Sequence, residues 1–331
     1  MSRPVFSFRP NLKNPEHEKA WQLLMEIPAG QRNQYLVDVI LEQEERETLK
    51  RLIQEAVREE LKCGDVERMP AQEKEEIPGQ MLDFLSECIR YGISVCVAGA
   101  TSSGKTTLLG WLLTTIPDGK RIYSIENGSR ELALVRRKDG RVVNSVIHTL
   151  TRDSENERQR VDQIALLDMA LRFNPDIIVV GEMRGPEANA AQEAARTGVA
   201  VVTTIHSMSC EATYRRMVSL CKRAVDMSDE TLMGFVTEAY PIIAFCKQLE
   251  NKERRLMEIM ECEITADGKR KFNPLYRYEI TENRMEGDRF IINGTHKKVC
   301  GISESLKKRF LENGMPKDVL ERIEKGGKKV C

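Results

Sequence analysis

The chain has 331 residues and a mass of 37.8 kDa, enough for two domains of ordinary size. Its 51 Lys and Arg residues balance its 51 Asp and Glu residues, which excludes a protein that coats a polyanion through high net charge. No run approaches the roughly 18 apolar residues of a membrane-spanning helix, and the N-terminus lacks the apolar core of a signal peptide. The nine cysteines show no metal-ligand spacing. These features predict a cytoplasmic protein with reduced thiols.

The distribution of apolar and polar residues predicts four segments. Residues 1–62 are expected to form a small strand-helix-helix module, and 63–79, rich in charge, Pro and Gly, a linker. Residues 80–282 alternate short apolar runs with amphipathic stretches, which is typical of βαβ units around a parallel sheet. Residues 283–331 are expected to be a polar, helical C-terminal tail.

The middle segment is predicted to have an α/β fold. Four short apolar runs are expected to be buried strands: 93–98, 121–125, 176–180 and 199–205. The stretch after Lys105 and the stretch 191–198 are expected to be helices between them.

Residues 99–106 match the phosphate-loop motif GxxxxGK[ST], after an expected strand and before an expected helix, as the motif requires. The glycines let backbone N–H groups turn toward phosphates, and the helix N-terminus favours negative charge. Lys105 is then expected to reach the β- and γ-phosphates, and the Thr106 hydroxyl to bind Mg²⁺. The predicted ATP-binding residues are Gly99, Ala100, Thr101, Ser102, Ser103, Gly104, Lys105, Thr106 and Thr107.

Three further segments each bring a polar side chain to the end of an expected strand. RIYSIENGSREL carries Glu126, RFNPDIIVVGEMRGPEA carries Glu182, and TGVAVVTTIHSMS carries His206. Ligands in open α/β sheets sit beyond the carboxyl ends of the strands, so these side chains are expected to face the phosphates.

In this order, the four segments resemble the secretion ATPases of type II and type IV secretion, and most closely the VirB/CpaF-type traffic ATPases. The resemblance covers the chain from about Ile77 to the C-terminus. It implies a RecA-like phosphate-loop core and Mg²⁺-dependent ATP hydrolysis. It also implies a homo-oligomeric ring, a hexamer by family resemblance, which works with membrane-embedded secretion or conjugation proteins at the inner face of the cell membrane.

The resemblance also implies roles for individual residues. Glu182 is expected to polarise the attacking water, directly or through the metal shell, so Thr106 and Glu182 are the candidate metal residues. Glu126 is expected to support Mg²⁺ or water, and His206 to sense the γ-phosphate. Arg184 is expected to couple the nucleotide state to a neighbouring subunit. One Lys, one metal ion and two acids suffice in kind for phosphoryl transfer. A role for Arg152 in stabilising charge is the weaker interpretation, and a surface position the better one.

The chain departs from the family pattern at two positions. Asn127 replaces an aspartate in the acidic box, and Val199 replaces the first histidine of the histidine box. We expect Asn127 to remove a charge that helps to hold Mg²⁺, and Val199 to remove a polar group from the sheet edge. The N-terminal segment also differs, because residues 1–76 do not resemble the N-terminal domain of the VirB/CpaF-type ATPases.

The first residues, RPVFSFRP, alternate in a way that places Arg3, Ser7 and Arg9 on one face of a strand. With the two helices that follow, they resemble the ribbon–helix–helix fold of ParR-type plasmid-segregation proteins. The resemblance implies that Arg3, Ser7 and Arg9 read DNA in the major groove. The alternative is a dimerisation or docking module, because this segment has no strongly basic footprint.

Three functional hypotheses follow. The leading one is a secretion or conjugation motor ATPase that powers DNA or protein transfer. The second is a DNA-binding segregation or relaxosome adaptor with a nucleotide-gated ATPase domain. The third, suggested by Asn127 and Val199, is a degenerate ATPase that binds ATP without hydrolysing it.

Overall fold

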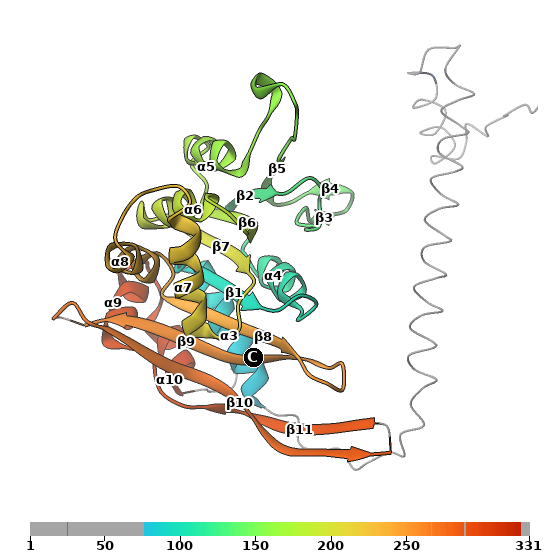
Figure 1. Ribbon diagram of the computed structural model, residues 1–331, viewed down its shortest axis with the longest axis vertical. Helices are drawn as coiled ribbons and strands as arrows, with labels where there is room; N and C mark the ends of the chain where they lie inside the picture. Colours follow the sequence, from blue (N-terminus) through green and yellow to red (C-terminus); the bar gives the residue numbers. More distant parts are fainter. Residues whose placement is uncertain (1–24, 26–75, 266, 288, 326–331) are drawn as a thin grey trace, which may run out of the picture. The chain divides into compact units, whose positions relative to one another are not determined.

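The computed structural model describes Met25 and residues 76–265, 267–287 and 289–325. The expected N-terminal module, with Arg3, Ser7 and Arg9, lies outside the described residues except for Met25. The expected linker also lies outside them, except for its last four residues, which belong to the first helix labelled in Figure 1.

Helices and strands alternate along most of the described region. In chain order they are α3 Glu76–Arg90, β1 Val95–Gly99, α4 Lys105–Thr114, β2 Arg121–Glu126, β3 Arg137–Lys138, β4 Arg141–Val142, β5 Ser145–Leu150, a 3₁₀ turn Glu157–Gln159, α5 Gln163–Arg172, β6 Ile177–Met183, α6 Glu187–Arg196, β7 Ala200–Ile205, α7 Cys210–Cys221, α8 Asp229–Ala239, β8 Ile242–Gln248, β9 Arg254–Ile264, β10 Arg270–Glu286, β11 Arg289–Lys298, α9 Glu304–Glu312 and α10 Lys317–Lys325. All four strands and both helices predicted from the apolar runs are present.

One large mixed sheet organises these elements, with the strand order β11-β10-β9-β8-β1-β7-β6-β2-β5. The strands from β8 to β5 in this order are parallel, so their carboxyl ends lie at one edge. β9, β10 and β11 extend the sheet in antiparallel fashion. The predicted α/β fold is confirmed, and β1, which leads into the phosphate loop, lies between β7 and β8.

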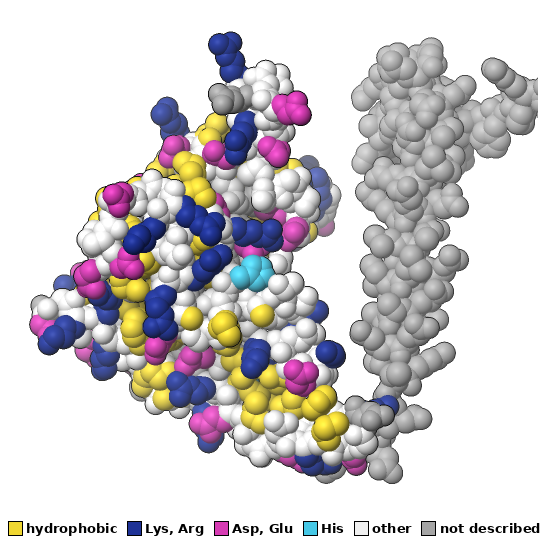
Figure 2. Space-filling view, viewed as in Figure 1, with side chains coloured by type: hydrophobic (Ala, Val, Ile, Leu, Met, Phe, Trp, Pro, Cys, Tyr) yellow, Lys and Arg dark blue, Asp and Glu magenta, His cyan; other side chains and the backbone are white. Residues whose placement is uncertain are grey.

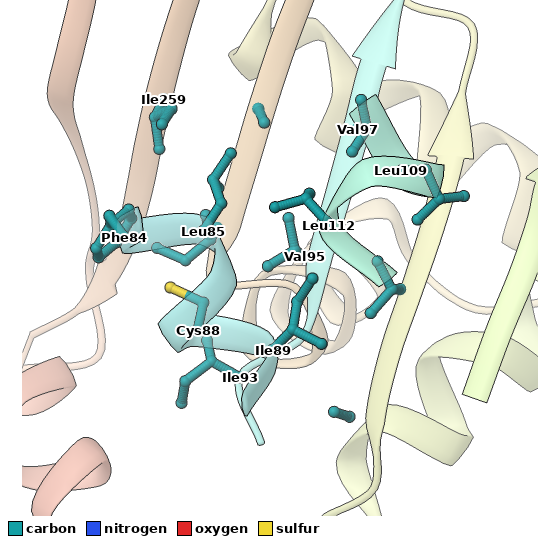
Figure 3. Close-up of a cluster of buried hydrophobic side chains, with 14 of the residues drawn as sticks. Phe84, Leu85, Cys88, Ile89, Ile93, Val95, Val97, Leu109, Leu112 and Ile259 are labelled. Carbon is teal, nitrogen blue, oxygen red and sulfur yellow. The ribbon is translucent and has the colours of Figure 1, made fainter. Parts of the chain in front are cut away.

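Helices cover both faces of the central parallel strands β1, β2, β6 and β7, so almost all of their residues are buried (Figure 1). Alternate residues of β1 point to opposite faces, with Val95 and Val97 in one hydrophobic cluster and Cys96 and Ala98 in another. α3 and α4 pack on the first face, where Ile89 of α3 and Leu112 of α4 lie beside Val95 of β1 (Figure 3). α6, α7 and α8 cover the second face.

The C-terminal part differs from its expected form. The boundary between 282 and 283 lies inside β10, and residues 289–298 form β11, so the prediction of a helical tail is wrong over this stretch. The two helices that follow are not a separate tail either, because Leu306 and Phe310 of α9 and Ile323 of α10 join the same core as α3. The few apolar side chains of these short helices recur at helical spacing within a mostly polar sequence. Composition alone therefore does not reveal that one face of each helix is buried.

No helix in the described region is both long and apolar enough to cross a bilayer.

Candidate functional site

The phosphate loop is wound around the carbonyl oxygen of Ala100. Ser103 donates to this oxygen from its hydroxyl group (2.8 Å), and the Lys105 ammonium donates to it as well (2.8 Å). Gly99 passes so close to β8 that a Cβ there would lie 2.2 Å from the Cys246 carbonyl oxygen. Gly104 has φ +92°, a left-handed conformation that favours glycine, immediately before α4. Glycine is therefore required at the two positions for different reasons: the close approach of β8 at Gly99 and the left-handed backbone at Gly104.

Lys105 is buried at the first turn of α4. Burial lowers the pKa of its ammonium group, and the nearby Glu182 carboxylate opposes this shift. Its Nζ atom also lies 3.5 Å from Nδ1 of His206. A lysine ammonium can only donate, so in this contact Nδ1 of His206 is the acceptor.

Glu182 connects the sheet edge to two cationic or proton-donating partners. Its Oε1 atom lies 2.8 Å from Nε2 of His206, and its Oε2 atom accepts a hydrogen bond from Arg184 at 2.6 Å. The bond to Glu182 raises the pKa of Arg184. Lys105, His206, Glu182 and Arg184 thus form one continuous polar chain, which we call the relay chain. The prediction that Glu182 and His206 lie at the same edge as the phosphate loop agrees with this geometry.

Arg184 and Glu182 differ in accessibility. The Arg184 side chain is 68% exposed, whereas that of Glu182 is 21% exposed. The backbone turn that carries Arg184 is fixed by Glu187, whose Oε1 accepts from the N–H groups of Arg184 (2.6 Å) and Gly185 (2.7 Å). The backbone of Arg184 is therefore fixed, and its guanidinium group bonds Glu182 while most of the side chain stays open to solvent.

Glu126 is buried at the same edge, with 3% exposure, but its carboxylate is engaged with its own loop. Oε2 accepts from the backbone N–H groups of Glu131 (2.7 Å) and Leu132 (2.9 Å), and Oε1 accepts from Ser124 at 3.2 Å. His148 faces the same Oε1 atom at 3.6 Å. These contacts fix the loop after β2, a positioning role that the motif pattern did not predict.

A cavity of about 310 Å³ lies between these groups. Thr106, Glu126 and Glu182 line it together with Asn127 and Arg184. A hydroxyl and carboxylate oxygens are donors suited to Mg²⁺, which takes few protein ligands beside water and phosphate oxygens. The residues present therefore fit the ion expected with ATP, with Thr106 and Glu182 as its candidate contacts. The Asn127 amide oxygen accepts from Thr151 at 2.6 Å.

Two residues that contact the site carried no recognisable sequence signal. Gln163, at the start of α5, lines the cavity and donates to the Glu182 carbonyl oxygen at 3.3 Å. Arg254, from β9, donates to the Ser102 carbonyl oxygen at 2.9 Å. Each residue is distant in sequence from the residue that it contacts, so only the fold brings Gln163 to Glu182 and Arg254 to the phosphate loop.

One sequence expectation changes in the structure. Val199 precedes β7 and so lies at the opposite end of that strand from His206, roughly 20 Å away at the rise of a strand. The expectation that it removes a polar group from the phosphate edge is wrong. Arg152 is exposed, in agreement with the surface position expected for it, and contacts Gln159 (3.4 Å), and no described contact joins it to the relay chain.

We compared the sequence with family models and with curated proteins. Residues 42–321 match the family model described as Type II/IV secretion system protein. The chain is 30% identical to the type IV secretion system protein VirB11 of Bartonella quintana over 175 residues, which are 52% of this chain and 47% of that protein. It is 30% identical to PtlH of Bordetella pertussis over 183 residues, 54% of this chain and 52% of that one. The chain spans about half the length of the curated relatives it matches.

Similar solved structures include the VirB11 ATPase of Brucella suis, with a TM-score of 0.48 and 24% identity over 56% of this chain and 53% of that chain. Another is the pilus retraction motor PilT, with a TM-score of 0.40 and 19% identity over 78% of this chain and 62% of that chain. The family model covers most of the chain, and the four motifs of the family resemblance occur in it in order. The chain therefore belongs to the type II/IV secretion system protein family.

Proposed function

We propose that the chain is an ATP-hydrolysing motor subunit of a type IV-like secretion or conjugation machine. The single observation that carries this proposal is the relay chain, which links the phosphate-loop Lys105 to Glu182 through His206 and ends on the exposed Arg184. Such a chain connects a phosphate site, an acid for water activation and the molecular surface. VirB11 and PtlH, to which the chain is similar, are named as type IV secretion system proteins.

The contacts of Lys105 suggest how ATP binding acts. Its ammonium group donates to the Ala100 carbonyl oxygen and approaches His206. Phosphate oxygens carry full negative charge and are stronger acceptors than a carbonyl, so the ammonium is expected to turn toward the β- and γ-phosphates. His206 then loses one contact and can donate to the γ-phosphate after turning away from Glu182.

Oε1 of Glu182 accepts no hydrogen bond from the described residues, although Nε2 of His206 lies 2.8 Å away. Movement of His206 would open space for the attacking water at this oxygen, which could then orient the water or accept its proton. A carboxylate tied to both His206 and Arg184 is a poor acceptor for a further proton, so hydrolysis would depend on phosphate occupancy. Mg²⁺, when bound beside Thr106, supplies charge neutralisation for the phosphate oxygens. Arg184 would carry the change to the surface, where a neighbouring subunit of a homo-oligomeric ring can contact it.

The proposal also covers the partners of the motor and the molecules that it transfers. Membrane-embedded secretion or conjugation proteins are the expected partners, and DNA or protein the expected cargo. A DNA-binding adaptor rests on Arg3, Ser7 and Arg9, which lie outside the described residues, and no observation in the described region favours it.

Steady-state ATP hydrolysis by the full chain, measured across protein concentration with and without Mg²⁺, tests the proposal. Hydrolysis that rises more steeply than protein concentration, and that disappears in Glu182→Gln, is the expected result. The matched control is Glu193→Gln, an acid of α6 that hydrogen-bonds Asn189 outside the relay chain. ATP binding without hydrolysis in the unaltered chain would instead support the degenerate ATPase.

A further inference from the structure

A second cavity, of about 370 Å³, lies beside the phosphate loop and is not part of the catalytic cavity. Its walls come from α3, from the first residues of β9 and from facing residues of β10 and β11. Met81, Arg254, Leu256, Tyr278, Gly294 and His296 are the lining residues that matter here. The cavity is therefore mostly apolar and aromatic, with arginine at one border.

Sheet topology places this cavity at the same edge as the phosphate loop. Gly99, the last residue of β1, pairs with Cys246 near the end of β8. β9 begins where β8 ends, since Arg254 pairs with Gln248. β10 and β11 return to that end of the sheet, where Tyr278 pairs with His296. Ligands of open α/β sheets bind along this carboxyl edge.

Arg254 connects the loop and the cavity physically. Its Nε atom donates to the Ser102 carbonyl oxygen, and its aliphatic stem passes 3.4 Å from the position a Cβ on Gly104 would take. The same side chain lines the second cavity. A guanidinium group in this position can hydrogen-bond a phosphate or a ribose that crosses from one site to the other.

The aromatic wall of the cavity is built in a fixed position. The rings of Tyr278 and His296 lie 4.8 Å apart between centroids, and Nε2 of His296 contacts the Leu256 carbonyl oxygen at 2.9 Å. Gly294 makes this arrangement possible, because a Cβ there would lie 2.6 Å from the Tyr278 ring. Hydrophobic side chains also gather over the part of the molecule where β10 and β11 run (Figure 2).

We propose that this cavity holds the purine base of the nucleotide whose phosphates bind residues 99–106, a step that rests on the proposed function. A flat aromatic base stacks favourably on tyrosine and histidine rings, and a largely apolar cavity with a few polar groups is typical of such ligands. Arg254 would lie between base and phosphates. The β10–β11 hairpin therefore takes part in nucleotide binding.

Calorimetric titration with ATP and with inorganic tripolyphosphate separates the base from the phosphates. For Tyr278→Ala we expect ATP to bind about tenfold more weakly, from the loss of one base–aromatic stacking contact, while tripolyphosphate binding stays unchanged. For Lys105→Ala we expect both ligands to bind more weakly. Equal loss for both ligands in Tyr278→Ala, or no loss for either, overturns the base site.

Two controls distinguish the loss of stacking from damage to the hairpin. Tyr278→Phe keeps the ring and is expected to bind ATP like the unaltered chain. Phe290→Ala removes an exposed ring from β11 of the same hairpin and is expected to leave both affinities unchanged. Weaker ATP binding in Phe290→Ala would contradict a role specific to Tyr278.

Photolabelling gives a readout on the unaltered full chain. We expect 8-azido-ATP to label peptides that contain Leu256, Tyr278 or His296, and excess ATP to suppress the label. Labelling confined to other peptides overturns the proposed base site but leaves ATP binding established. If neither ATP nor tripolyphosphate binds the unaltered chain, the proposed function itself fails.

Discussion

Oε1 of Glu182 lies 2.8 Å from Nε2 of His206, although the two residues leave different strands, β6 and β7. These strands are neighbours in the sheet, so their carboxyl ends bring an acid and an imidazole together. The other ring nitrogen of His206 faces Lys105 at 3.5 Å. One imidazole thus lies against both the phosphate-loop lysine and the candidate catalytic acid, which makes it a suitable reporter of phosphate occupancy.

Substitution of His206 tests this connection. For His206→Ala we expect kcat for ATP hydrolysis to fall about 100-fold, at the lower end of what a positioned acid–base group contributes. ATP affinity should stay within a few-fold, because the phosphate loop is intact. Single-turnover hydrolysis and equilibrium ATP binding on the same preparation check both statements. An unchanged kcat would remove His206 from the mechanism.

Arg184 is expected to matter for assembly and hydrolysis rather than for folding. Its ion pair with Glu182 involves a side chain that is 68% exposed, so Arg184→Ala should change the free energy of unfolding by less than about 1 kcal/mol. ATP hydrolysis should fall at least tenfold and lose its dependence on protein concentration. Arg196→Ala, which breaks an ion pair with Glu238 on α8, is the matched control and should hydrolyse ATP normally.

Glu126 is expected to act on the fold as well as on the site. Glu126→Ala leaves the N–H groups of Glu131 and Leu132 without their acceptor, a loss of about 1–3 kcal/mol for a buried group. Glu126→Gln keeps one acceptor oxygen and should be destabilised less. Urea denaturation of the two variants measures the difference. If both variants were as stable as the unaltered chain, the carboxylate would not hold the loop.

Ser303 offers a test of the helical C-terminal part. Its hydroxyl caps α9 by accepting from Leu306 N and also donates to the buried Glu261 carboxylate. Ser303→Ala should therefore lower the free energy of unfolding by about 2–3 kcal/mol, from a lost cap and a buried acceptor left short of a partner. Ser228→Ala removes only a cap, that of α8, and should cost about 1 kcal/mol. A loss no larger than that of the control would count against the Glu261 contact.

His148 should contribute to the pH dependence of stability. Burial and the Arg130 guanidinium lower the pKa of His148 in the folded chain, while Glu126 opposes them. Below about pH 6.5, the ordinary histidine pKa, the unfolded chain takes up this proton before the folded chain does. The free energy of unfolding should therefore fall as the pH drops through this value, and fall less in His148→Gln. Urea midpoints at about pH 7.5 and about pH 5.5, on either side of the ordinary histidine pKa, measure this for both chains. Identical pH dependence would contradict the assignment.

Local sequence determined the parallel part of the sheet and the phosphate loop. The runs at β1, β2, β6 and β7 are apolar because helices bury both faces of these strands, so each run is visible without knowing its neighbours. The motif at residues 99–106 is contiguous, and the carboxyl ends of parallel strands share one edge, so Glu126, Glu182 and His206 could be assigned to that edge from the sequence.

Only the tertiary structure determined which contacts these side chains make. Pairing across strands fixed the relay chain, turned Glu126 toward its own loop and placed Val199 at the far end of β7. Arg254 and Tyr278 reach the phosphate edge only because β9, β10 and β11 reverse direction beside β8. These contacts join residues far apart in the chain, such as Ser102 and Arg254. Periodicity and motif spacing describe neighbours along the chain, whereas such contacts depend on strand order and register, which the packing of the whole sheet determines.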